Sequence, residues 1–165
     1  MKKMRSVIEI LQGRTPIFRG RMTDDSRDFN NTKIVDLEGV MAFFNDSVIP
    51  PFDDFSDTTY GNIVKAFLAW LISQHNAQVE EFQQFRLGRV TVTDPNNTLP
   101  RSLSDYTTTW EVLKTRLFES SLGGYLCIRY EYENGKQVNY IDYLADFVSD
   151  DGAYLKNTQD IVFGE

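Results

Sequence analysis

The chain contains one cysteine and one histidine among 165 residues, which excludes an intrachain disulfide and leaves few ligands for a metal site. A single cysteine cannot form a disulfide within the chain, which agrees with production in a reducing cytosol. One cysteine and one histidine also supply too few ligands for a zinc site unless two carboxylates join them, and no ligand spacing indicates that. We therefore expect neither a disulfide framework nor a metal centre.

Long apolar runs are missing as well. No stretch approaches the ~20 apolar residues that a helix needs to cross a bilayer. The chain begins with Met1, Lys2 and Lys3, but the residues after them alternate in polarity and do not form the apolar core of a signal peptide. These patterns predict no membrane insertion and no secretory leader.

Positive charge is scarce too. The 17 Lys and Arg are outnumbered by 24 Asp and Glu, which gives a net charge of −7. Proteins that hold a phosphate backbone need clustered Lys and Arg, so we expect no specific binding of nucleic acid. The nearest approach to a basic patch is a set of arginines that alternate with apolar residues along two predicted strands: Arg14, Arg19, Arg21 and Arg27. We interpret this set as a solvated strand face.

Familiar cofactor motifs do not occur. The sequence has no P-loop, no GxGxxG fingerprint and no GxSxG nucleophile turn. The segment from Asp24 to Asn30 places oxygen-bearing side chains at alternate positions, as a calcium loop does. It has Phe29 where such a loop needs glycine and Val35 where it needs a bidentate glutamate, so we interpret it as a polar turn. We expect no cofactor.

Cys127 and His75 are the only residues from which a thiol nucleophile and its base could be assembled. That chemistry requires the two side chains within hydrogen-bond reach and a third group that orients the base. Cys127 lies in the middle of a predicted strand, whereas reactive thiols occupy sites that lower the thiol pKa, such as a helix N-terminus. We interpret Cys127 as a small apolar filler and His75 as a helix-end residue. No enzyme is expected, and a small cell-wall peptidase that uses Cys127 and His75 is the alternative hypothesis.

The sequence does contain enough apolar material for a folded core. Hydrophobic residues make up 41% of the chain, including 12 Phe, 8 Tyr and 2 Trp, and charged residues make up 25%. This composition is typical of a soluble globular protein with one ordinary domain or two small ones.

The first third of the chain is predicted to be rich in strands. Alternating polarity favours strands over residues 6–11, 16–22 and 32–38. A polar loop is expected over residues 23–31, and a short helical turn over residues 40–44. Pro50 and Pro51 end this unit, because proline continues neither a helix nor a sheet ladder.

The first long helix is predicted over residues 59–76. Its apolar side chains recur at the spacing of a helix packed on a sheet: Ile63, Val64, Phe67, Leu68, Leu71 and Ile72. We expect Asp57 or Thr58 to cap its start and Asn76 to cap its end. A strand over residues 86–93 follows it.

A second helix is predicted over residues 108–122. Thr108 and Glu111 form a capping box, in which each side chain satisfies a free backbone N–H at the helix start. Gly123 suits the left-handed conformation that ends a helix. The apolar residues of this helix fall on one face: Trp110, Leu113 and Leu117.

Asn134 and Gly135 predict a β-hairpin, because both residues tolerate the positive φ of a type I′ turn. A two-residue loop sets the register of the two strands. One face then pairs Leu126 with Tyr143, Ile128 with Ile141, Tyr130 with Asn139 and Tyr132 with Gln137. The other face pairs Cys127 with Asp142, Arg129 with Tyr140 and Glu133 with Lys136. Apolar pairs thus gather on one face and charges on the other, as a half-buried antiparallel pair requires.

Together, these elements predict an α+β fold with mainly antiparallel sheets and two principal helices. The order of several segments also resembles the N-terminal half of the prophage endopeptidase tail family. The resemblance extends over nearly all of the chain, and its most specific segments are residues 38–47 (EGVMAFFNDS), 75–78 (HNAQ) and 140–144 (YIDYL). Members of this family are tail-associated, hub-like minor structural proteins of phages that infect Gram-positive bacteria.

The resemblance implies a structural component of a phage or prophage tail tip, located in the virion tail and assembled in the bacterial cytoplasm. It also implies a hub-like fold, in which residues 1–49 resemble part of the first hub barrel and residues 50–165 form an α+β segment. The expected partners are the distal tail protein and the tape measure, with a homotrimer in the full-length context. The C-terminal lysin region of longer members has no counterpart in these residues, so the peptidase activity is not expected to transfer. A glycan-binding module that displays Trp and Tyr on a sheet face is the third hypothesis.

Overall fold

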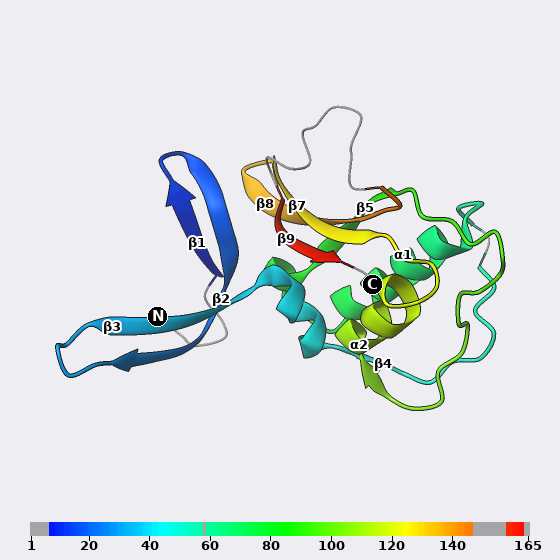
Figure 1. The fold of residues 1–165 in the computed structure, drawn as a ribbon, viewed down its shortest axis with the longest axis horizontal. Helices are drawn as coiled ribbons and strands as arrows, with labels where there is room; N and C mark the ends of the chain where they lie inside the picture. Colours follow the sequence, from blue (N-terminus) through cyan, green and yellow to red (C-terminus); the bar gives the residue numbers. More distant parts are fainter. Residues whose placement is uncertain (1–6, 58, 147–157, 164–165) are drawn as a thin grey trace.

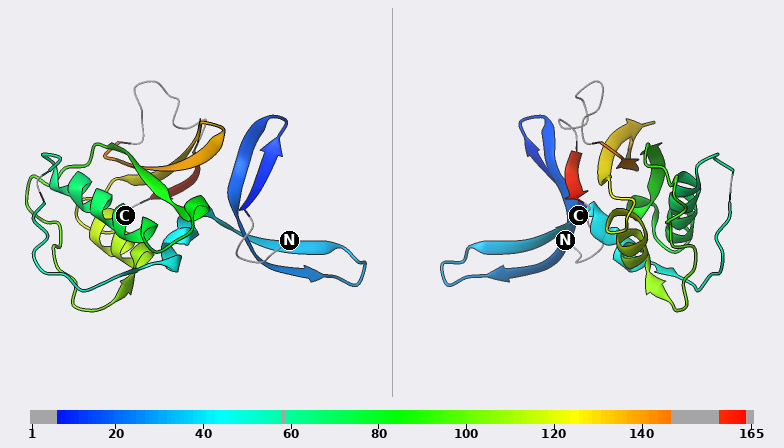
Figure 2. Two further views of the ribbon diagram at one scale, coloured as in Figure 1. Left: turned by 180° about the vertical axis from the view of Figure 1, so that it is seen from behind. Right: turned by 45° about the vertical axis from the view of Figure 1, so that its right-hand side comes forward.

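The computed structural model describes residues 7–57, 59–146 and 158–163, and it confirms the predicted α+β class with mostly antiparallel sheets (Figure 1). Residues 7–39 form a three-stranded antiparallel sheet that we call the arm, and the residues that follow form the body. The strands of the arm are β1 (Val7–Gln12), β2 (Thr15–Arg27) and β3 (Lys33–Gly39). Figure 2 shows from two further sides that the arm projects away from the body.

The body is built around a four-stranded sheet in the order β5-β8-β7-β9. Its strands are β5 (Phe85–Val90), β7 (Tyr125–Glu133), β8 (Lys136–Leu144) and β9 (Thr158–Phe163). Helix α1 (Ile63–Asn76) packs on β5 of this sheet, and α2 (Thr109–Leu113) packs on α1 and η1. Shorter elements complete it: η1 (Val40–Asp46), β4 (Val48–Ile49), η2 (Glu81–Gln83), β6 (Thr107–Thr108) and the π-helical turn η3 (Lys114–Phe118).

One hydrophobic core lies between the helices and the four-stranded sheet. It combines apolar residues of α1 and α2 with the inner face of the β7–β8 hairpin, for example Leu68, Leu71, Leu113, Leu126 and Ile141. Each of these side chains is fully buried. Leu113 and Leu117 of the predicted second helix therefore belong to the same core as Leu126, Ile128 and Ile141 of the hairpin, and Trp110 packs against that core.

The hairpin itself confirms the prediction in detail. Asn134 and Gly135 have φ values of 51° and 77°, and every cross-strand pair deduced from the turn is present in the register of β7 and β8. Gly123 has a left-handed conformation, with φ of 63°, but it does not end the second helix as predicted, because the π-helical turn already ends at Phe118 with Glu119 as its C-cap. The turn and the register of the hairpin depend on residues close in sequence, which is why local reasoning found them.

The boundaries of the first helix differ from the prediction. It begins at Ile63 rather than near residue 59, and its cap is Asn62, whose side chain accepts from the backbone N–H of Val64 at 3.0 Å. Asp57 instead accepts from the backbone N–H of Thr59 at 2.8 Å, in a local turn before the helix.

Asn76 does not cap the end of α1, because its side chain has a tertiary role. Its amide donates to the backbone oxygen of Phe85 at 2.7 Å and accepts from the backbone N–H of Phe85 at 2.9 Å. The C-cap position belongs to Ala77 instead.

The second helix is shorter than the predicted residues 108–122. Thr108 is its N-cap, as expected, and accepts from the backbone N–H of Glu111 at 3.3 Å. Regular α-helix ends at Leu113, and the chain continues as a π-helical turn to Phe118.

The expected loop over residues 23–31 is also wrong in its first half. Strand β2 continues to Arg27, and Asp25 pairs with Val35 of β3. Polar residues can extend this strand because the outer part of the arm packs on no core and does not require alternating polarity. The predicted helical turn after the arm is confirmed as the 3₁₀ helix η1.

Candidate functional site

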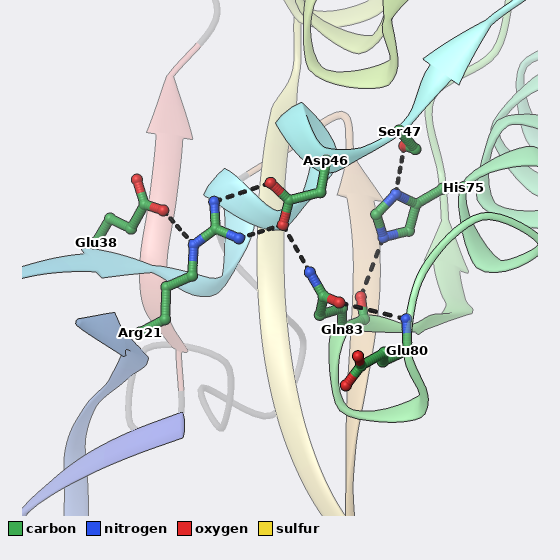
Figure 3. Close-up of polar contacts among 7 residues, drawn as sticks. All are labelled: Arg21, Glu38, Asp46, Ser47, His75, Glu80 and Gln83. Atoms are coloured by element: carbon green, nitrogen blue, oxygen red, sulfur yellow. Dashed lines mark hydrogen bonds and ion pairs between the residues drawn. The ribbon is translucent and has the colours of Figure 1, made fainter. Parts of the chain in front are cut away.

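A polar network lies where the arm joins the body (Figure 3). Its centre is Arg21 on β2, which is only 4% exposed. The Arg21 guanidinium bonds to Glu38 on β3 and to both carboxylate oxygens of Asp46 at the end of η1, with Nη2 to Oδ1 at 3.0 Å. Burial alone would lower the pKa of Arg21, but the hydrogen bonds to Asp46 and Glu38 outweigh it and raise that pKa. Arg21 therefore carries a permanent charge that holds two strands of the arm to the body.

The network continues from Asp46 to His75 through Gln83. The Gln83 amide donates to Asp46 at 2.6 Å, and the Gln83 backbone oxygen accepts from Nε2 of His75 at 3.0 Å. Nδ1 of His75 then accepts from the hydroxyl of Ser47 at 2.6 Å, and that hydroxyl lies 2.6 Å from the hydroxyl of Thr109. Figure 3 shows this continuous path from the arm to α1.

The Ser47–His75 pair is placed for structure and not for catalysis. Both residues are 0% exposed, so no substrate can reach the hydroxyl. Burial lowers the pKa of His75, which keeps the ring neutral. A neutral imidazole has one donor nitrogen and one acceptor nitrogen. The donor bonds to the backbone oxygen of Gln83 and the acceptor to the hydroxyl of Ser47, so both ring nitrogens are satisfied.

The structure does not bring Cys127 and His75 together as a nucleophile and base. His75 bonds to Ser47 and Gln83 through its two ring nitrogens, and Cys127 lies on β7 opposite Asp142. Cys127 is 2% exposed, and burial next to Asp142 raises its pKa to about 11. At neutral pH the thiol is therefore protonated and inert.

The expectation that the arm arginines form a solvated face is wrong for two of them. Arg19 and Arg21 are 7% and 4% exposed, whereas Arg14 and Arg27 remain exposed. Positions 19 and 21 point the same way along β2, because side chains alternate between the faces of a strand. At this point β2 lies against the body, with β9 and η1 as neighbours, and the two guanidinium groups become buried there.

The segment that resembles a calcium loop does not form one. Asp24 and Asp25 belong to β2, and the carboxylate of Asp28 accepts from the backbone N–H groups of Asn30 at 2.9 Å and Thr32 at 2.8 Å. Only the residues after Arg27 form the polar turn that we predicted for this segment. Within the described ranges, no group of three or more His, Cys, Asp or Glu side chains is arranged to hold a metal ion.

A cavity of about 630 Å³ opens between the tip of the β7–β8 hairpin, η2 and the arm. Arg19 lines it from the arm, and the other charged or amide side chains include Gln84, Arg86, Glu133, Lys136 and Gln137. Ion pairs of Arg86 with Glu133 and of Lys136 with Glu81 border the cavity. Sequence reasoning missed this site, although the predicted hairpin register already placed Gln137 and Asn139 on one face of β8.

None of the helices in the described ranges is long and apolar enough to cross a membrane. Comparisons with protein-family models, with curated proteins and with solved structures found no match. The resemblance to phage tail proteins therefore rests on the sequence segments quoted above.

Proposed function

We propose that the chain is a structural component of a phage or prophage tail tip, of the baseplate-hub or tail-associated type. It acts in tail assembly and host attachment through protein–protein contacts, and it is not an enzyme. Beside the resemblance in sequence, one structural observation supports a binding role: the arm carries large apolar side chains that nothing in the described ranges covers.

The exposed apolar residues are concentrated on the arm. Five of the nine large hydrophobic side chains that are exposed in the described ranges belong to residues 7–39: Ile10, Leu11, Ile17, Phe29 and Ile34. No residue of the arm belongs to the hydrophobic core cluster. Single exposed apolar residues are ordinary, but a small sheet without a core needs a packing partner for stability. A surface of this kind favours assembly with another protein.

The arm also has the hydrogen-bonding capacity for such a contact. β1 and β3 are the two edges of its sheet, so each presents backbone N–H and C=O groups along its outer side. An edge strand can accept a strand from a partner. Arg21 joins β2 to β3 through Glu38 and holds the arm to the body through Asp46, and this gives the contact surface a defined orientation.

The two alternatives have less support. A cysteine peptidase would need Cys127 and His75 side by side and accessible, and both are buried with other partners. A glycan-binding sheet would display its tryptophans, but Trp70 and Trp110 pack against the core. Trp70, for example, makes ring contacts with Phe52 at 4.9 Å and Phe55 at 5.5 Å.

The proposal is tested by mixing the chain with a distal tail protein of the same phage or prophage and measuring the complex by light scattering and calorimetry. We expect a complex that Leu11→Asp and Ile34→Asp each weaken at least 10-fold without lowering Tm. The matched control is Tyr106→Ser, which removes a 73% exposed aromatic residue from the body and should leave the affinity unchanged. Absence of binding to any tail protein, together with cleavage of wall peptides or binding to a sugar array, would favour one of the alternatives.

The oligomeric state provides a second test. A closed ring needs two different patches on each subunit. From the resemblance, we expect the protein to form a trimer in the assembled hub. Light scattering measures the oligomeric state, and a protein that stays monomeric at high concentration, with no partner tail protein bound, would count against the hub assignment.

A further inference from the structure

The turn between β2 and β3 carries the most exposed large apolar side chain of the described residues. Phe29 is 105% exposed, whereas the other exposed large hydrophobic side chains range from 40% to 73%. Figures 1 and 2 show that this turn is the end of the arm farthest from the body. Exposure of this size leaves the whole ring in water, so its burial against a partner is favourable.

Hydrogen bonds hold the turn that presents Phe29. The backbone N–H of Asn31 donates to the backbone oxygen of Asp28 at 3.0 Å, which closes a β-turn with Phe29 at its second position. The Asp28 carboxylate accepts from the backbone N–H groups of Asn30 at 2.9 Å and Thr32 at 2.8 Å. The backbone under Phe29 is thus fixed before a partner binds, so little conformational entropy is lost on binding.

The residues around Phe29 are mostly polar, and their summed charge is negative. Residues 24–36 contain four aspartates and two basic residues, which gives this end of the arm a net charge of −2. An exposed aromatic side chain within a polar rim has the composition of a binding hot spot, in which the ring enters a pocket and the rim excludes water. Because the charges on two docked surfaces are complementary, the partner surface that fits is an apolar pocket with a basic rim.

We propose that the end of the arm is a docking surface for another protein, in which Phe29 enters an apolar pocket bordered by Lys or Arg side chains. The proposal rests on the proposed binding role of the arm, and it adds the anchor residue and the chemistry of the partner. A second copy of this chain fits less well, because the chain has a net charge of −7 and its smaller cavity, of about 370 Å³, is lined by Asp94. An anionic lipid surface also fits less well, since it repels a negatively charged segment.

The first experiment measures the complex with the distal tail protein by calorimetry. Phe29→Ala should weaken binding at least about 10-fold and leave Tm unchanged, because the side chain is fully exposed in the free chain. Asn30→Ala is the matched control. It removes an exposed side chain from the same turn but keeps the backbone N–H that bonds to Asp28, so the affinity should change less than about 2-fold. If Leu11→Asp and Ile34→Asp weaken the complex and Phe29→Ala does not, the proposed function stands and the docking proposal is overturned.

Further variants test the turn and the charge of the same complex. Asp28→Ala keeps Phe29 but removes the acceptor of two backbone N–H groups, so the affinity should fall about 3-fold below that of Asp28→Asn, which keeps an acceptor oxygen. Asp36→Asn removes an exposed negative charge, and the association rate at low salt should fall about 2-fold. Equal affinities of the two Asp28 variants would overturn the role of the fixed turn, and an unchanged or higher rate for Asp36→Asn would overturn the basic rim.

The second experiment does not assume that the partner is a tail protein. The photo-reactive amino acid p-benzoylphenylalanine replaces Phe29 in the native host, and mass spectrometry identifies what it links to under light. We expect an adduct with another protein at an apolar pocket bordered by Lys or Arg, and the same group in place of Asn30 should give much less of it. Such an adduct with a protein outside the tail would support the docking proposal and contradict the proposed function. Adducts only with lipid or with a second copy of the chain, or none above the Asn30 control, would overturn the docking proposal.

Discussion

The backbone at Gly88 passes so close to the side chain of Asp142 that no side chain fits between them. A Cβ atom on Gly88 would overlap the Asp142 carboxylate. Asp142 is fully buried, and it accepts hydrogen bonds from the backbone N–H of Arg89 at 2.6 Å and from Nε of Arg129 at 3.0 Å. The glycine thus allows a buried, bonded carboxylate to lie between the parallel strands β5 and β8.

Gly88→Ala is therefore expected to lower the free energy of unfolding by about 2–3 kcal/mol, because the added methyl group displaces a buried carboxylate or separates the two strands. Urea denaturation measures the change. The control is Arg89→Ala in the same strand, whose exposed side chain should contribute less than about 0.5 kcal/mol. Equal stabilities of wild type and Gly88→Ala would show that the strands are farther apart than the structure places them.

Gly135→Val should destabilise the hairpin through its backbone alone. The residue has φ of 77°, and a Cβ there would meet no atom within 4 Å, so no clash is involved. A left-handed conformation costs an ordinary residue about 1–2 kcal/mol, and a β-branched residue resists it most. Chemical denaturation should show a loss of this size. Gly135→Asn is the control, because asparagine tolerates positive φ, and an equal loss in both variants would contradict the assigned turn.

Removal of the Arg21 charge should loosen the junction between arm and body. Arg21→Gln leaves Glu38 and Asp46 without their cation, and we expect a loss of roughly 3 kcal/mol, the low end for a buried pair because both carboxylates are partly exposed. Lys33→Gln is the comparison, since it breaks an exposed pair with Asp25 and should cost less than about 1 kcal/mol. Equal effects measured by denaturation would mean that the junction network does not stabilise the arm.

Stability should fall on mild acidification because of His75. Burial lowers its folded-state pKa below the unfolded value of about 6.5, so the unfolded chain takes up the proton first. The stability that the neutral His75 contributes is fully present above about pH 7. It is lost as pH falls below about 6.5, with a slope in the free energy of unfolding of at most about 1.4 kcal/mol per pH unit. Urea denaturation from pH 7.5 to 5 measures it. His75→Gln should remove this slope, and a variant with an unchanged pH profile would show that His75 is not responsible.

Cys127 should react slowly with alkylating reagents while the chain is folded. Its pKa of about 11 leaves little thiolate at pH 8, and its 2% exposure blocks access. We expect labelling by iodoacetamide, followed by mass spectrometry, to require urea. Rapid labelling of the native chain would favour the peptidase hypothesis, and Cys127→Ala would then be tested on wall peptides.

Short-range sequence patterns were sufficient for some features of this fold. The turn at Asn134-Gly135 follows from the backbone preferences of two adjacent residues, and the register of the whole hairpin follows from that turn. Thr108 caps its helix because its hydroxyl bonds to a backbone group three residues away. Each of these interactions joins residues that are neighbours along the chain.

Interactions between distant segments determine the roles of Asn62 and Asn76 at the two ends of α1, which the sequence did not predict. Asn62 caps α1 in place of the predicted Asp57, and it also donates to the backbone oxygen of Val92, 30 residues away. Asn76 likewise bonds to β5 instead of ending its own helix.

The sequence by itself determined the α+β class and the hairpin, because alternation of polarity and turn preference act over a few residues. Only the tertiary structure decided that Arg19 and Arg21 are buried while Arg14 and Arg27 are exposed, since all four follow the same polar pattern. The difference arises where β2 meets the body. There Arg21 bonds to the carboxylates of Glu38 and Asp46. Arg19 bonds to the amide oxygen of Asn139, 120 residues away, and lines an open cavity. The environment of a charge depends on which surfaces meet in the fold, and residue spacing along one strand does not contain that information.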